Sequence, residues 1–151
     1  MKPDLNILYL CTGNSARSIL AEAITNQWPL LPVAPGSIDV TAYSAGSDPN
    51  GRVNPQALNE LIARDLSTDG LASKSWDEFS RPNAPEFEWV ITLCDSAAAE
   101  SCPVFPGSAK KIHWGLPDPA SGDATFADIF DRLVNLIGGL MDGNPPDSAG
   151  R

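Results

Sequence analysis

The fold class of this chain can be predicted from residues 5–18, which read Leu5-Asn-Ile-Leu-Tyr-Leu-Cys-Thr-Gly-Asn-Ser-Ala-Arg-Ser18. Its first six residues are mostly apolar and are followed by a glycine-containing turn, which is typical of a strand buried inside a parallel sheet. Residues 16–28 then carry apolar side chains at helical spacing until Pro29 ends the pattern. We therefore predict a strand, a tight loop and a helix in that order.

The alternation of strands and helices continues along the rest of the chain. Further strands are predicted at residues 38–44, 88–93 and 110–114, helices at 55–66 and 126–140, and a short helix at 73–79. Asn54 and Pro55 suit the N-cap and the first position of the helix at 55–66. This order predicts an α/β fold, with a four-stranded parallel sheet flanked by helices and joined by right-handed crossovers. Ligands of such sheets bind beyond the carboxyl ends of the strands, where Cys11, Cys94 and the loop after His113 are expected to meet.

Length and charge limit what the chain can be. Its 151 residues suit one domain, which we expect to span residues 1–142, with residues 143–151 as a flexible tail. The formal net charge of −9 argues against binding to nucleic acid or to an anionic membrane surface. The overall field also repels an oxyanion, so any anion site must draw its attraction from local dipoles and a nearby arginine.

The cysteines and the N-terminal residues point to a reducing compartment. Three cysteines, an odd number, argue against a disulfide framework and favour reactive thiols. Residues 1–4 run directly into the first predicted strand, and no apolar stretch has the length of a secretion signal or a membrane span. We therefore expect a cytoplasmic protein that interacts with neither membranes nor nucleic acid.

The loop between the first strand and helix is a candidate anion site. Unpaired backbone N–H groups and the helix dipole attract a tetrahedral oxyanion there. Five residues separate Cys11 from Arg17, so a curled loop can place the sulfur beneath the anion while the guanidinium binds two of its oxygens. The same surroundings favour a thiolate, to which Ser18 can donate a hydrogen bond while Asn14 pins the loop. The candidate substrate-binding residues are Thr12, Gly13, Asn14, Ser15, Ala16, Arg17 and Ser18.

From the residues alone, Cys11 can also be a small buried apolar side chain and Arg17 a solvated helix residue. The sequence Cys-Thr-Gly-Asn-Ser-Ala-Arg-Ser of residues 11–18 resembles the phosphate-binding loop of the low-molecular-weight tyrosine phosphatase family. Later segments resemble the arsenate reductase branch of that family, namely Tyr43-Ser44-Ala45-Gly46, Asn54-Pro55, Thr92-Leu93-Cys94 and His113-Trp114-Gly115 with Asp118-Pro119-Ala120. The resemblance covers residues 5 to about 140 and implies a flavodoxin-like strand order of 2-1-3-4.

The resemblance implies a reduction of arsenate by three thiols, without a tightly bound cofactor. Cys11 attacks arsenate, and Asp118 protonates the departing oxygen as a general acid. Cys94 then attacks Cys11 and releases arsenite, and Cys102 attacks Cys94 to leave a disulfide for an external thiol reductant. From residue types alone, Asp118 can instead be an ordinary turn residue, and Cys94 and Cys102 can be buried and unreactive.

The spacing of the second and third cysteines departs from the family pattern. Seven residues separate Cys94 from Cys102, whereas the pattern has six. In one intact helix the two would lie about 12 Å apart, beyond the limit of about 7 Å for a disulfide. Their bond therefore requires the alanine-rich segment between them to unwind. Both thioredoxin and glutaredoxin with glutathione stay open as the electron donor.

Some thioredoxin-coupled relatives hold a potassium ion beside the loop. The matching oxygen-bearing residues here are Asn14, Glu22, Ser44 and Asp77, which can equally be caps and surface polar residues. His113 is the single histidine and provides no metal-binding set, so we interpret it as a structural residue at a strand end.

Two other functions compete with arsenate reduction. A tyrosine phosphatase would use the same Cys11, Arg17 and Asp118, but here Ala120 stands where such enzymes have aromatic support, and they need no counterpart of Cys94. A non-catalytic oxyanion-binding module would need neither a nucleophile nor an acid.

Overall fold

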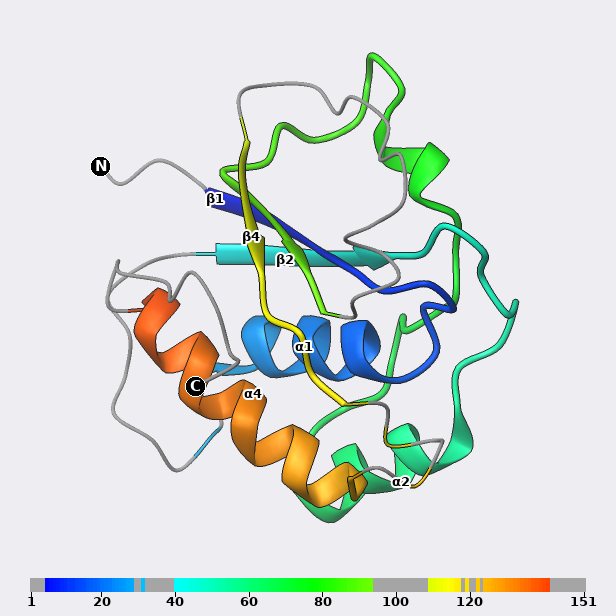
Figure 1. The fold of residues 1–151 in the computed structure, drawn as a ribbon, viewed down its shortest axis with the longest axis vertical. Helices are drawn as coiled ribbons and strands as arrows, with labels where there is room; N and C mark the ends of the chain where they lie inside the picture. Colours follow the sequence, from blue (N-terminus) through cyan, green and yellow to red (C-terminus); the bar gives the residue numbers. More distant parts are fainter. Residues whose placement is uncertain are drawn as a thin grey trace.

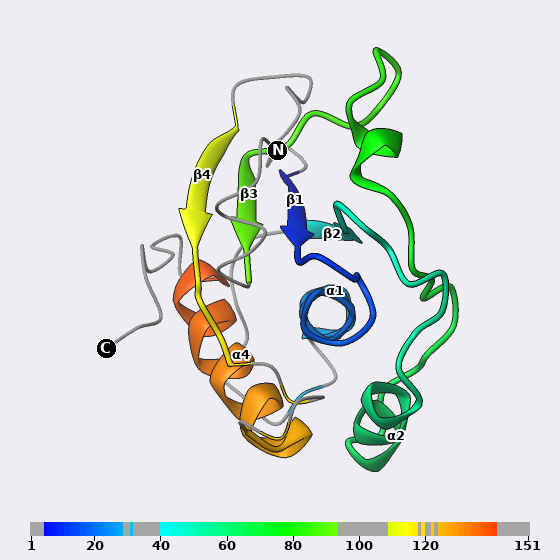
Figure 2. The same cartoon turned by 45° about the vertical axis from the view of Figure 1, so that its right-hand side comes forward.

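The computed structural model describes residues 5–28, 31, 40–93, 109–117, 119, 122 and 124–141. Its strands are β1 (Leu5–Leu10), β2 (Val40–Ala45), β3 (Trp89–Thr92) and β4 (Lys110–His113). Its helices are α1 (Arg17–Asn26), α2 (Pro55–Ala63), the 3-10 helix η2 (Trp76–Phe79) and α4 (Phe126–Met141). Figure 1 shows how these elements are arranged. All strand pairs are parallel and the order is β2-β1-β3-β4 (Figure 2), which confirms the predicted fold class.

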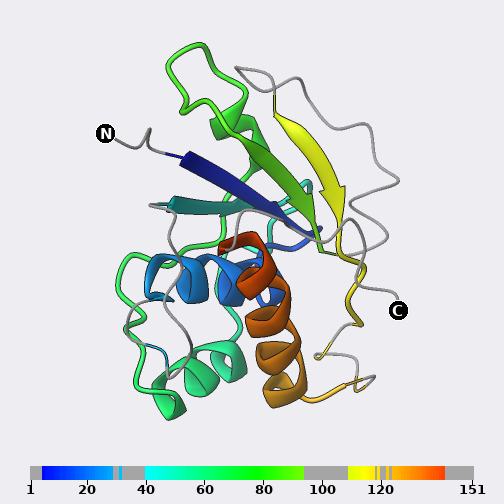
Figure 3. The same cartoon turned by 90° about the vertical axis from the view of Figure 1, so that its left-hand side faces the viewer.

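Helices α1, α2 and α4 all lie on one face of the sheet (Figures 2 and 3). Residues of β1 alternate between the two faces, so Ile7 and Tyr9 pack toward these helices, whereas Leu8 and Leu10 pack on the opposite face. A strand buried on both faces needs a nearly continuous apolar sequence, which is the pattern that predicted β1. The opposite face carries a smaller apolar cluster that includes the edge-to-face rings of Tyr43, Phe79 and Phe87.

The elements end close to their predicted bounds, with two informative differences. The predicted helix at 55–66 stops at Ala63, because Asp65 adopts a left-handed backbone conformation with φ of 62°. Leu66 is nonetheless buried, since its N–H bonds back to Leu61 O at 3.0 Å. The short helix predicted at 73–79 forms only a 3-10 turn, capped by the Ser75 side chain. The predicted tail at 143–151 lies outside the described residues.

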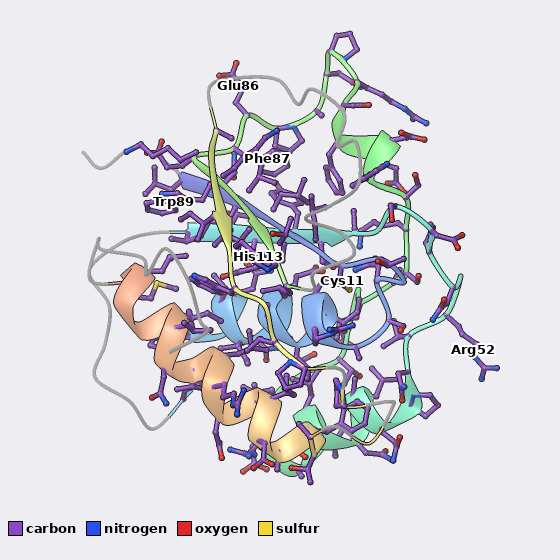
Figure 4. All side chains as sticks on the ribbon, in the orientation of Figure 1. Cys11, Arg52, Glu86, Phe87, Trp89 and His113 are labelled. Atoms are coloured by element: carbon purple, nitrogen blue, oxygen red, sulfur yellow. The ribbon has the colours of Figure 1, made fainter. Side chains whose placement is uncertain are left out.

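The register of the sheet gathers several segments at one edge. Leu10, at the end of β1, pairs with Ala45 of β2 and with Thr92 of β3, which in turn pairs with His113 of β4. The residues that follow these four positions therefore meet beyond the carboxyl ends of the strands. Figure 4 shows Cys11 at this edge, next to the start of α1, with Glu86 and Phe87 at the other end of the sheet.

Candidate active site

The loop at residues 11–16 is fastened from outside through its carbonyl groups. The hydrogen bonds run from Asp48 N to Thr12 O (2.9 Å), from Asn50 N and Ser73 Oγ to Gly13 O (both 3.0 Å), and from Asn54 N to Ser15 O (2.9 Å). In a trans peptide unit the N–H points opposite to the C=O. Carbonyls bound from outside therefore turn the next N–H groups toward the inside of the loop, where they present positive dipoles to an anion.

The start of α1 adds to this anion-binding polarity. Ala16 occupies its N-cap, makes no side-chain capping bond, and is followed by a first turn without an acidic residue. Helix α2 differs, because Asn54 Oδ1 accepts a capping bond from Gln56 N at 2.8 Å. Unsatisfied N–H groups and the helix dipole at the first turn of α1 therefore remain available to attract an oxyanion.

Gly46 lets β2 approach the loop closely. A Cβ atom at this position would lie 2.4 Å from Thr12 O and 2.7 Å from Cys11 O, both of them backbone atoms. Gly46 is itself held by bonds from its N–H to Lys74 O and from Trp76 N to its carbonyl, each 2.9 Å long. Any larger residue would therefore push the loop away from its support.

A chain of hydrogen bonds reaches the sulfur of Cys11 from beneath the loop. The backbone N–H of Lys74 donates to Asn14 Oδ1 at 2.8 Å, which fixes the orientation of the Asn14 amide. Asn14 Nδ2 then donates to Ser18 Oγ at 2.7 Å, and Ser18 Oγ lies 2.9 Å from Cys11 Sγ, in a hydrogen bond to which either atom can contribute the proton. Cys11, Asn14 and Ser18 are all buried. A hydroxyl that donates to a thiolate stabilises that charged form.

Asn14 also has an unusual backbone. Its φ of 46° lies in the left-handed region, which asparagine tolerates better than most residues other than glycine. The side chain and the backbone of Asn14 together explain why this position needs asparagine.

Arg17 begins α1 and is half-buried beside the loop. Its Nη1 donates to Leu116 O at 2.8 Å, and Leu116 N donates to Leu93 O at 3.0 Å, so the guanidinium lies against the segment after β4. Arg52 is exposed and extends away from the molecule (Figure 4). The predicted residues Asp118, Cys94 and Cys102 lie outside the described residues.

The residues expected to hold potassium already make hydrogen bonds to one another and to Lys74. Asn14 Oδ1 already accepts the Lys74 N–H, and Ser44 Oγ donates to Glu22 Oε1 at 2.5 Å. Burial raises the pKa of Glu22, while the Ser44 bond and the charge of Lys74 act in the opposite direction. Asp77 is exposed on η2. The Lys74 ammonium lies 4.0 Å from Glu22 Oε1, so a potassium ion on this carboxylate would meet a second positive charge, which makes these residues a poor fit for the ion.

His113 contacts Thr92 across the ends of β3 and β4, with Nδ1 2.7 Å from Thr92 Oγ1. Among the described residues, no three histidine, cysteine or acidic side chains are grouped so that they could hold a metal ion. No helix in that part of the chain is long and apolar enough to cross a membrane.

A family model for low molecular weight phosphotyrosine protein phosphatases matches residues 6–144. The chain belongs to this family. An arsenate reductase from Staphylococcus xylosus is 36% identical to it over 132 residues, which cover 87% of this chain and 92% of the relative. The residues matched by the family model include the loop of residues 11–16 and nearly all of the strands and helices described above.

Several solved structures share the fold. A low molecular weight protein tyrosine phosphatase from T. tengcongensis matches with a TM-score of 0.69 and 22% identity, over 92% of this chain and 99% of that one. A thioredoxin-dependent arsenate reductase from Corynebacterium glutamicum matches with a TM-score of 0.68 and 21% identity, over 93% of this chain and 62% of that one. At these identities the likeness establishes the fold alone.

Sequence reasoning did not assign the residues that fasten the loop from outside. These are Asp48, Asn50, Asn54 and Ser73, which bond to its carbonyl groups, together with Lys74, which bonds to the Asn14 side chain, and Gly46, which lies close to its backbone. Gly46 stood in a recognisable segment, but Ser73 and Lys74 contact loop residues 60 positions away and left no local signal.

Proposed function

We propose that the protein reduces arsenate to arsenite with Cys11 as the nucleophile. The observation that carries this proposal is the 36% identity, over most of both chains, to a protein named arsenate reductase. The hydrogen bond between Ser18 Oγ and Cys11 Sγ supports it chemically, because thiol attack on an oxyanion requires a thiolate.

The first step forms a bond from sulfur to arsenic. The Cys11 thiolate attacks arsenate held by the inward N–H groups of the loop, and Arg17 binds two of its oxygens. Asp118 donates the proton that lets one arsenate oxygen leave as water. The product is a thiol–arsenate adduct in which arsenic is still pentavalent.

The second step transfers two electrons. The Cys94 thiolate attacks Cys11 Sγ, the S–S bond forms, and the electron pair of the S–As bond stays on arsenic, which leaves as arsenite. Cys102 then attacks Cys94 and releases the Cys11 thiolate. The chain ends with a Cys94–Cys102 disulfide, which an external dithiol reduces.

Thioredoxin is the donor that this relay favours. A disulfide within one chain is reduced by a dithiol through a mixed disulfide, whereas a glutathione and glutaredoxin route leaves Cys102 without a role. The relay needs its thiols reduced between turnovers, so we place the reaction in the cytoplasm.

A tyrosine phosphatase is the second candidate, because the phosphatase from T. tengcongensis has the same fold. Cys11 and Arg17 would then transfer phosphate through a phosphocysteine. This reaction needs neither Cys94 nor Cys102, which makes these two cysteines the discriminating residues.

The test measures arsenite formation and aryl phosphate hydrolysis by the wild type, Cys11→Ser, Cys94→Ser and Cys102→Ser, with thioredoxin and glutaredoxin supplied separately. We expect Cys11→Ser to lose both reactions, and Cys94→Ser and Cys102→Ser to lose arsenate turnover while keeping any phosphatase activity. Normal arsenate turnover by Cys94→Ser with either donor would refute the relay. Normal arsenate turnover by Cys102→Ser with glutaredoxin, but not with thioredoxin, would show that glutathione and glutaredoxin are the electron donors.

A further inference from the structure

Lys74 connects the segment before η2 to Asn14 in the anion loop and to Glu22 on α1. Its backbone N–H donates to Asn14 Oδ1 at 2.8 Å, at the start of the hydrogen-bond chain that ends at Cys11. The ammonium of its side chain has different partners: Nζ lies 4.0 Å from Glu22 Oε1 and donates to Ala72 O at 2.9 Å. The backbone of Lys74 thus contacts the loop, and its side chain approaches helix α1.

Glu22 needs a positive charge close to it. Its side chain is only 14% exposed, and its carboxylate lies beside the Ser44 hydroxyl, which donates to Oε1, and the Lys74 ammonium. A carboxylate buried to this degree is costly unless it is hydrogen-bonded and paired with a cation. The Lys74 side chain, itself 20% exposed, provides that charge from within the chain.

The same arrangement leaves little for a free cation to bind. Asn14 Oδ1 already accepts the Lys74 N–H, Glu22 Oε1 already accepts the Ser44 hydroxyl, and a second positive charge beside the ammonium would be repelled. Because the lysine is covalently attached, it also loses less freedom on pairing than an ion taken from solution.

We propose that the Lys74 ammonium is the built-in counter-charge of Glu22, so that the anion loop is braced without a bound monovalent cation. Lys74 is a positioning residue in this account, because its side chain acts on Cys11 through Glu22 and the seating of α1, while its backbone N–H, which Lys74→Met retains, orients Asn14. The proposal goes beyond the proposed arsenate reduction and does not depend on it, since loop bracing also affects folding stability.

The first test compares the melting temperature of the wild type in potassium, sodium and choline chloride at one ionic strength. We expect the three melting temperatures to agree within about 1 °C, because a potassium ion stabilises the folded chain only if the folded chain binds it. A saturable rise in melting temperature with potassium, absent with choline, would overturn the proposal.

The second test is a double-mutant cycle of Lys74→Met and Glu22→Gln, read by denaturant unfolding and by the rate at which iodoacetamide alkylates Cys11. We expect Lys74→Met to slow alkylation about 10-fold, Lys74→Arg to stay near wild type, and Glu22→Gln to recover most of the loss in the double variant. Lys110→Met, which removes an exposed lysine of β4, is the matched control and should change neither readout. Purely additive effects of Lys74→Met and Glu22→Gln would contradict the pairing. Neither readout uses arsenate, so this result stands apart from the test of the proposed function.

Discussion

Replacing Gly46 with alanine is the smallest change that should disable the anion loop. The added Cβ would lie 2.4 Å from Thr12 O and 2.7 Å from Cys11 O. Ordinary van der Waals contact begins at 3.4 Å, so the Thr12 carbonyl must retreat by about 1 Å. Gly46 cannot yield in return, because its own N–H and carbonyl are bonded to Lys74 and Trp76.

The magnitude follows from this displacement. Overpacking of a well-fitted site costs about 1–3 kcal/mol, which lowers the melting temperature of a chain this size by roughly 3–10 °C. The effect on catalysis is larger, since a misplacement of about 1 Å in catalytic groups can cost about 10²-fold in rate. We therefore expect Gly46→Ala to remain folded at 25 °C while losing about 10²-fold in kcat/KM for arsenate.

The assay combines thermal melting with arsenite formation under a saturating thiol donor. Gly70→Ala is the matched control, because Gly70 has a φ of 80° and open space around it. That variant should lose about 1 kcal/mol of stability from backbone strain and keep wild-type activity. If Gly46→Ala reduces arsenate within about 2-fold of the wild type, the close fit of β2 against the loop is not what positions Cys11.

Three further predictions test other contacts. Ser18→Ala should slow alkylation of Cys11 by iodoacetamide about 10-fold at pH 7, because it removes the hydroxyl that would donate to the reacting thiolate; an unchanged rate would exclude this donor. Arg64→Ala should lower the free energy of unfolding by about 1–2 kcal/mol in urea, through lost pairing with carboxylates of α2 and α4 and lost stacking on an α4 ring, and should leave kcat unchanged. Gly138→Ala should stabilise α4 by about 0.5–1 kcal/mol, because its Cβ meets Trp28 at an ordinary 3.8 Å; a lower melting temperature would mean that this contact is too tight.

Much of the fold was predictable because its signals are local. The apolar run of β1, the turn that follows it and the helical spacing in α4 each lie within one short segment, and all three elements form close to their predicted bounds. The end of α2 was not predictable in the same way. It depends on the left-handed backbone of Asp65, which lets Leu66 fold back into the core.

In the candidate site, too, residues with local sequence signals could be predicted and residues that act through distant contacts could not. The hydrogen-bonding residues Asn14 and Ser18 stand in the loop sequence itself, so their chemistry could be inferred from residue type and spacing. Lys74 could not, because its role depends on contacts with Asn14 and Glu22 made across the fold. The sequence around this lysine does not indicate that its side chain lies beside the largely buried carboxylate of Glu22.

A single-turnover reaction without any external reductant tests the central claim most directly. Fully reduced protein is mixed with excess arsenate and quenched, and arsenite and free thiols are counted against the three cysteines of the chain. We predict one arsenite per protein and the loss of two thiols as one disulfide, because each reduction of arsenate takes two electrons from a thiol pair. A full set of three free thiols with no arsenite formed would contradict the account.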